Sequence, residues 1–181
     1  TTRKHEFDFE ETFPSMRGMA RKSLRLHPRQ AEGLPPDESK VGGVFLWPGA
    51  EARPVCPQQR CPLVPVMQLF QRDFPNIDFP KGRNLLQVLW YPQYYEECGY
   101  RPKVDLRWHD SSQLDDFLEP DYINHDPCFE VTECRIDPEE VIEYPYVDQL
   151  TDEQASDVFS RVSHRDYQQL WSFCPGTKVG G

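Results

Sequence analysis

Eighteen prolines are spread through the 181 residues of this chain, and they limit its helices to short segments. A proline inside a helix removes a backbone hydrogen bond, and its ring clashes with the preceding turn. Short apolar or alternating segments, the pattern of strands, fill much of the remaining sequence. We therefore predict an α+β fold, in which a strand-rich mixed sheet is accompanied by few short helices.

Four segments predict the strands of one sheet system. Residues 41–47 and 63–70 are short and apolar, and residues 103–109 alternate between apolar and charged side chains. Residues 84–91 are almost wholly apolar, which is typical of a central strand buried on both faces. The side chains that we expect to be buried are Leu86, Val88, Trp90, Val66 and Leu106.

The clearest helix start is Thr151-Asp152-Glu153-Gln154. A Thr followed three residues later by Gln forms a capping box, in which each side chain binds a backbone N–H group of the other residue. Apolar residues then recur at helical spacing, which predicts a helix from about 152 to 162. A second short helix is predicted through Tyr167, Leu170 and Trp171.

The N-terminal residues 1–19 mix charged side chains with three phenylalanines. Their pattern matches neither a helix nor a strand, and we interpret them as an arm that packs only locally. The domain then covers residues 20–181, and it begins with a predicted strand in which Leu24 and Leu26 alternate with polar residues.

The chain contains twenty Lys and Arg against thirty Asp and Glu, which gives a net charge of −10. This charge disfavours binding to nucleic acid and to anionic membranes. No apolar run approaches the roughly 18 residues of a transmembrane helix, and no signal peptide follows the polar start. These features predict a cytoplasmic protein with neither nucleic acid nor membrane among its partners.

Six cysteines stand at positions 56, 61, 98, 128, 134 and 174. A chain of this length can build a core without a disulfide scaffold, and it lacks a signal peptide. We therefore expect six thiols and no disulfide, as in a reducing compartment.

No catalytic or cofactor motif is found in the sequence. It has no Gly-x-Ser-x-Gly elbow, and Gly42-Gly43 leads into a strand, whereas phosphate-binding glycines lead into a helix. This favours a protein without enzymatic activity or cofactor. The alternative is a small-ligand or metal-binding domain, enzymes included, with a cleft between its halves. Its residues would be His109, His125, Asp126 and Cys128, because imidazole, carboxylate and thiolate groups suit zinc or iron.

One pattern occurs twice: Ser39-Lys40-Val41-Gly42-Gly43 recurs as Thr177-Lys178-Val179-Gly180-Gly181. The recurrence indicates an internal repeat. Four further stretches accompany the two copies, namely RLHPR at 25–29, VFLWP at 44–48, LVPVMQL at 63–69 and FPKGRNLLQVLW at 79–90. In their order and spacing, these stretches resemble the YwqG-like family, a bacterial domain of unknown function.

The resemblance implies two similar halves, the second of them incomplete, because YwqG-like proteins continue beyond the second Lys-Val-Gly-Gly. It also implies an immunity or partner protein near a bacterial toxin. A strand missing from a sheet leaves unpaired backbone groups and an uncovered apolar face. We therefore expect the chain either to pair that edge with a partner or a second copy, as a homo-oligomer, or to expose an apolar strip beside residues 85–90.

The function that we predict is a non-enzymatic protein-interaction module. Tyrosines follow residues 84–91 in a loop that also contains acids, and tyrosine is favoured at binding surfaces. An acidic and aromatic face would cover a basic protein partner, and its charge would speed the encounter. The predicted contact residues are Tyr94, Tyr95, Glu96, Glu97 and Tyr100, and the predicted steering charges are Asp115, Asp116 and Glu119.

Overall fold

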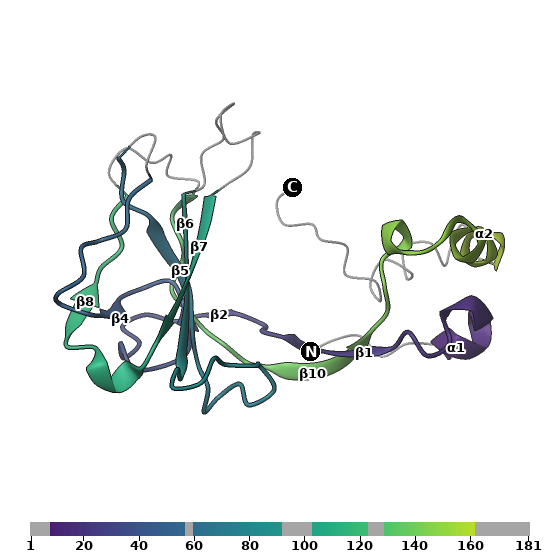
Figure 1. The fold of residues 1–181 in the computed structure, drawn as a ribbon, viewed down its shortest axis with the longest axis horizontal. Coiled ribbons are helices and arrows are strands. Elements are labelled where there is room, and N and C mark those ends of the chain that lie inside the picture. Colours follow the sequence, from purple (N-terminus) through teal and green to yellow (C-terminus); the bar gives the residue numbers. More distant parts are fainter. Residues whose placement is uncertain (1–7, 57–59, 92–102, 123–128, 162–181) are drawn as a thin grey trace. The chain divides into compact units, whose positions relative to one another are not determined.

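The computed structural model of the protein describes residues 8–56, 60–91, 103–122 and 129–161 (Figure 1). The chain divides into two units. The first unit combines residues 1–27 with residues 138–181, and the second unit is residues 28–137.

In the first unit, two strands form an antiparallel ribbon: β1 (Arg21–Arg25) pairs with β10 (Glu139–Glu143). Basic side chains of β1 and its end meet carboxylates of β10. The contacts are Lys22–Glu140 at 3.0 Å, Arg25–Glu143 at 3.3 Å and His27–Glu139 at 2.7 Å. Some of the basic residues near position 25 therefore contact carboxylates of β10, which lies more than 110 residues later in the sequence.

Helices complete this unit. The short helix α1 (Phe9–Thr12) is followed by the 3-10 turn η1 (Pro14–Met16). A second 3-10 turn, η5 (Val147–Gln149), precedes α2 (Asp152–Arg161). None of the described helices is long and apolar enough to span a membrane.

The expectation that the N-terminal arm packs only locally is wrong for its described residues. Phe9, Phe13 and Met16 are buried together with Val158 of α2. The ring of Phe9 also stacks on the ring of Tyr144, with 4.0 Å between the ring centroids. A single helical turn is too short to remove its own apolar side chains from water, so these side chains are buried against the C-terminal part of the unit.

The capping box at the start of α2 is confirmed. The side chain of Gln154 accepts a hydrogen bond from the backbone N–H of Thr151 at 3.0 Å. The hydroxyl of Thr151 accepts from the backbone N–H of Gln154 at 3.3 Å. The helix ends at Arg161, one residue before the predicted end. The second predicted helix, through Tyr167, Leu170 and Trp171, lies outside the described residues.

The second unit is built on a six-stranded sheet in the order β2-β9-β3-β5-β6-β7. All its pairings are antiparallel. The strands are β2 (Arg29–Gln30), β3 (Lys40–Val41), β5 (Val64–Phe70), β6 (Leu85–Tyr91), β7 (Lys103–His109) and β9 (Cys134–Arg135). The predicted strand-rich α+β fold with few short helices is thereby confirmed.

The expectation of one sheet system is wrong at residues 41–47. This segment is divided between β3 and β4 (Phe45–Trp47), and β4 pairs instead with β8 (Asp116–Leu118) in a separate two-stranded sheet. Gly42 and Gly43 lie between the two strands with φ of 63° and 72°. These left-handed conformations, which suit glycine, let the chain change direction after two residues of strand.

The two-stranded sheet covers one face of the larger sheet, and Figure 1 shows β4 and β8 on one side of β5, β6 and β7. The buried cluster between the two sheets contains Phe45, Trp47, Cys56, Leu63, Leu89, Tyr91 and Leu118. Removal of these aromatic and aliphatic side chains from water stabilises the unit.

The prediction that β6 is buried on both faces is wrong. Its fully buried side chains are Leu85, Gln87, Leu89 and Tyr91. The residues expected to be buried, Leu86, Val88 and Trp90, lie on the opposite face and are half-buried, as is Val66. Leu106 of β7 is 54% exposed, contrary to expectation. The reason is that only the face toward β4 and β8 is covered by the buried cluster.

Candidate functional site

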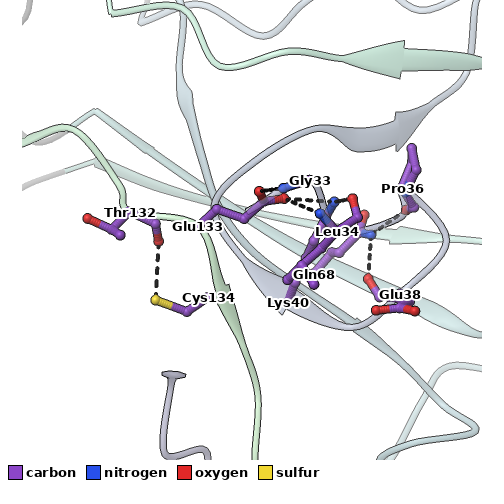
Figure 2. A network of polar contacts seen from close by, with 9 residues as sticks. All are labelled: Gly33, Leu34, Pro36, Glu38, Lys40, Gln68, Thr132, Glu133 and Cys134. Atoms are coloured by element: carbon purple, nitrogen blue, oxygen red, sulfur yellow. Dashed lines mark hydrogen bonds and ion pairs between the residues drawn. The ribbon is translucent and has the colours of Figure 1, made fainter. Parts of the chain in front are cut away.

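The repeated Lys-Val-Gly-Gly pattern has a structural role at its first copy. Lys40 is completely buried, and its Nζ donates to the carbonyl of Leu34 at 2.9 Å and lies 3.5 Å from Glu133 Oε1. Figure 2 shows that Glu133 also accepts hydrogen bonds from the backbone N–H groups of Gly33, at 2.7 Å, and Leu34, at 3.3 Å. The network fastens the 33–34 loop to β3 and to the chain entering β9.

The charge state of Lys40 reflects this burial. Loss of water around the ammonium group lowers its pKa, and the charges of Glu133 and Glu38 oppose that effect. Gly43 completes the arrangement, since a Cβ atom there would lie 2.2 Å from Glu133 Oε1. The motif therefore holds the fold together at this point. The second copy, residues 177–181, lies outside the described residues.

Two buried glutamines continue this network across the sheet. The Nε2 group of Gln68 donates to the carbonyls of Pro36 at 2.5 Å and Glu38 at 2.7 Å (Figure 2). The Nε2 group of Gln87 donates to the carbonyl of Leu46 at 2.7 Å and to Gln68 Oε1 at 3.3 Å. These bonds satisfy backbone carbonyls of loops and of β4 that the ladders of the larger sheet do not reach.

The predicted contact residues Tyr94, Tyr95, Glu96, Glu97 and Tyr100 belong to the connection between β6 and β7, outside the described residues. The three predicted steering charges are described, and the structure brings them together on β8 and its flanks. Asp115, Asp116 and Glu119 are exposed, and none of them forms an ion pair with another described residue.

Among these three, Asp115 accepts the backbone N–H of Gly49 at 2.7 Å. Phe117 stands in the same strand and is 56% exposed. The sequence prediction had not singled out Phe117, an exposed aromatic side chain that lies in the sequence between acids without ion pairs in the described part of the chain.

Of the residues proposed for a metal, only His109 is described, and His125, Asp126 and Cys128 lie outside. Within the described part of the chain, no group of three His, Cys, Asp or Glu side chains could hold a metal ion. Cys56, Cys61 and Cys134 form no disulfide within this part, and the other three cysteines lie outside it.

His109 lies at the end of β7, and its Nε2 atom is buried and has no hydrogen-bond partner among the residues that the structure describes. Its ring meets the ring of Trp47 edge-on, with 5.7 Å between centroids. Burial lowers the pKa of His109, the nearby charges of Arg107 and Arg83 lower it further, and Glu51 opposes them. The imidazole is therefore held in its neutral form more firmly than a histidine in water.

A row of apolar side chains runs across the outer face of β6 and β7. Opposite residues of an antiparallel pair point to the same face, and the register places Leu86 opposite Trp108, Val88 opposite Leu106 and Trp90 opposite Val104. We call these six residues the apolar row. Val104 is 52% exposed and Leu106 is 54% exposed, so the apolar strip expected beside residues 85–90 is present.

A groove of about 630 Å³ lies at the C-terminal half of β7, and we call it the edge groove. Five consecutive residues, 106–110, line it, so it is bordered by side chains from both faces of the strand. The remaining lining residues are Pro48, Glu51, Gln113 and Leu114 together with Pro80 and Arg83. Within the described residues, β7 pairs with β6 alone, so its other side has no strand.

The polar face of β7 is organised around Arg107. Its guanidinium binds Glu51 at 2.6 Å through Nη1. It also binds the carboxylate of Asp105 at 3.0 Å through Nε and at 2.9 Å through Nη2. Sequence reasoning missed this arrangement and the exposed side of β7, because alternation shows that a strand has two faces but does not show which face is covered.

Comparison with known proteins yields no match to a family model and no match to a curated protein.

Proposed function

We propose that this chain is a non-enzymatic protein-interaction module that binds an extended protein segment along β7. The observation that carries the proposal is the exposure of Val104 and Leu106, each more than half exposed, on a strand with one neighbour. An edge strand offers unpaired N–H and C=O groups to another chain, and such strands form additional ladders readily.

The surroundings of β7 support this use. A strand that blocks further pairing usually carries prolines, a bulge or unpaired charges that point toward the sheet. β7 (KVDLRWH) contains no proline and pairs with β6 in unbroken register. Two of its charged side chains, Asp105 and Arg107, are paired with each other. The edge groove leaves room beside residues 106–110. The apolar row would become covered when a neighbouring strand brings its own apolar side chains to that face.

The acidic residues add a long-range element to the proposal. Residues 28–137 contain eleven Lys and Arg and eighteen Asp and Glu, a net charge of −7 for the second unit. The exposed carboxylates of Asp115, Asp116 and Glu119 would attract a basic partner and raise its association rate. The YwqG-like resemblance extends the proposal to a cytoplasmic immunity or partner protein of a bacterial toxin.

Photocrosslinking tests the proposal. A photoreactive amino acid is placed at Val104 or Leu106, and the matched control position is Ile142 of β10, which is 48% exposed. Illumination of the cells that make the protein should give one discrete crosslinked protein from positions 104 and 106, identified by mass spectrometry, and none from 142. Absence of crosslinks from both β7 positions, or equal crosslinks from Ile142, would contradict the proposal.

The second candidate function is a small-ligand or metal site. The buried, unpartnered Nε2 atom of His109 favours it, because a native structure rarely leaves such an atom without a partner. The site would then be the edge groove inside the second unit. Metal analysis of the purified protein tests the metal form, since stoichiometric zinc or iron lost in His109→Gln would support this function against the first.

A further inference from the structure

We infer that the extended segment bound along β7 is β7 of a second copy of this chain, antiparallel and centred on Leu106. The inference rests on the proposed function, because it names the partner of the same edge. It would join the two six-stranded sheets into one continuous sheet through a two-fold axis, which is the commonest symmetry of homo-oligomers.

Charge complementarity selects this partner and this register. With Leu106 opposite Leu106 of the second copy, Asp105 lies opposite Arg107 of the second copy, and Arg107 opposite its Asp105. Opposite charges that face each other across an antiparallel pair stabilise it, and like charges destabilise it. The sequence of β7 is therefore complementary to itself.

Neighbouring registers lack this property. Centred on Asp105, the pairing would place Asp105 against Asp105 and Lys103 of each copy against Arg107 of the other, so that like charges meet at three positions. Centred on Arg107, it would place two guanidinium groups against each other. Of these symmetric registers, the sequence KVDLRWH thus favours the one centred on Leu106.

The apolar row gives the same register. Val104 lies opposite Trp108 of the second copy, and the two Leu106 side chains meet on the axis. All these side chains share the outer face, because pairing residues in an antiparallel sheet point to the same side. The two apolar rows would then form one continuous strip. Val104 and Leu106, its most exposed members, would bury the largest solvent-accessible area.

The edge groove accommodates the N-terminal half of the second strand. In this register, residues 103–106 of the second copy run beside residues 106–109, which line the groove. Lys103 of the second copy then lies opposite His109, on the face that also carries Glu51, which binds Arg107. An ammonium group entering this part of the groove meets a carboxylate, so the half-strand and the groove are complementary.

A pair of seven-residue strands is a small interface, and small interfaces belong to weak complexes. We therefore expect a dissociation constant on the order of ten micromolar. Sedimentation equilibrium should show dimers at about 100 µM chain and monomers at about 1 µM, as mass action requires. Asp115, Asp116 and Glu119 do not line the edge groove. The second copy carries the same net charge of −10, so the basic partner that these acids would attract is a different protein.

A charge-swap experiment tests the register. Asp105→Arg gives a chain with two cations at these positions, and Arg107→Asp gives a chain with two anions. Each variant alone should be monomeric at about 100 µM, because like charges then face each other twice across the axis. A one-to-one mixture should form a dimer of mixed composition, since every cation again faces an anion. Neither variant can form these charge pairs with a copy of itself, so a dimer in the mixture must contain one chain of each variant.

The controls separate loss of contact from loss of fold. Both charge-swap variants break the ion pair between Asp105 and Arg107, and Arg107→Asp also breaks the one with Glu51. Their thermal melts are therefore recorded beside that of Leu106→Asp, which changes an exposed side chain and keeps every ion pair. Leu106→Asp should melt like the parent and stay monomeric. Asp116→Arg reverses an exposed charge on β8 and should dimerise like the parent.

The outcomes distinguish this inference from the proposed function. A parent chain that stays monomeric at about 100 µM, or variants that do not associate on mixing, would overturn the second copy as the partner. Crosslinks from Leu106 to a different protein would then still support the proposed function. Absence of crosslinks from both β7 positions, with a monomeric chain, would overturn both.

Discussion

The carboxylate of Glu133 lies 3.5 Å from the ammonium group of Lys40, and Lys40 is completely inaccessible to solvent. The lysine belongs to β3 and the glutamate directly precedes β9, so the contact crosses two strands that pair with each other. A buried ammonium group is costly unless it is paired and hydrogen-bonded. Here the carbonyl of Leu34 and the carboxylate of Glu133 supply those partners.

Replacing Lys40 by Met should lower the free energy of unfolding by about 3 kcal/mol, because removal of one member of a buried pair leaves the other without its partner. Urea denaturation of the parent and the variant measures the loss. Lys22→Met is the matched control: Lys22 pairs with Glu140 at 3.0 Å, but its side chain is 74% exposed. It should cost less than about 1 kcal/mol. Equal losses would show that the buried pair has no special role.

Replacing Gly43 by Ala should destabilise the protein more than replacing Gly82 by Ala. Both glycines have positive φ, 72° and 75°, so each alanine carries the cost of a left-handed conformation, about 1–2 kcal/mol. At Gly82 a Cβ atom meets nothing within 4 Å, whereas at Gly43 it would lie 2.2 Å from Glu133 Oε1. Gly43→Ala must therefore also displace Glu133 from Lys40. Melting curves that shift equally would contradict this account.

The sequence predicted those strands and helices whose formation depends on residues close together in the chain. The segments 63–70, 84–91 and 103–109 are strands close to their predicted bounds, and the capping box at Thr151 begins a helix. Each of these signals depends on residues within one turn or one strand. The prediction of 41–47 as one strand failed because Gly42-Gly43 was interpreted as the start of the strand, although it is the turn between two.

The buried face of β6 could not be predicted in this way. Leu86 and Leu89 are both apolar, so the sequence of the strand contains no signal for which of them is covered. The answer depends on β4 and β8, whose small sheet packs on the side of Leu89. For the same reason Leu106 was predicted to be buried, although it is exposed at the edge.

The candidate site was predictable only in part. Asp115, Asp116 and Glu119 are exposed as steering charges require, since charged residues rarely lose their contact with water. The contact between Lys40 and Glu133 could not be predicted from sequence spacing. These residues lie far apart in the sequence and come together only because β3 pairs with β9 in the sheet.

Replacing Thr151 by Ala should destabilise α2 by about 1 kcal/mol, because the variant loses the acceptor for the N–H of Gln154. Ser160→Ala is the control within the same helix. The Ser160 hydroxyl donates to the carbonyl of Asp157, a bond that contributes little to helix stability. Amide hydrogen exchange of residues 152–161 measures both changes. Faster exchange in Thr151→Ala but not in Ser160→Ala is expected, and equal rates in both variants would argue against the cap.

Acidification should destabilise the protein through His109, and His109→Gln should remove that part of the pH dependence. Burial lowers the pKa of His109 below its ordinary value of 6.5 in the folded protein. The unfolded chain therefore binds the proton first as the pH falls, and stability linked to this residue is full above about pH 6.5 and declines below it. Urea denaturation between about pH 7.5 and 5 measures the decline.

The parent and His109→Gln share every other titrating group, so the difference between their two curves isolates this histidine. As the pH falls, the free energy of unfolding of the parent should decrease more than that of His109→Gln, because glutamine stays neutral. An NMR titration of the His109 ring should independently show a midpoint below 6.5, the ordinary value. Parallel stability curves, with a midpoint at or above the ordinary value, would mean that the Nε2 atom is solvated in solution and that its burial beside Trp47 does not restrain its protonation.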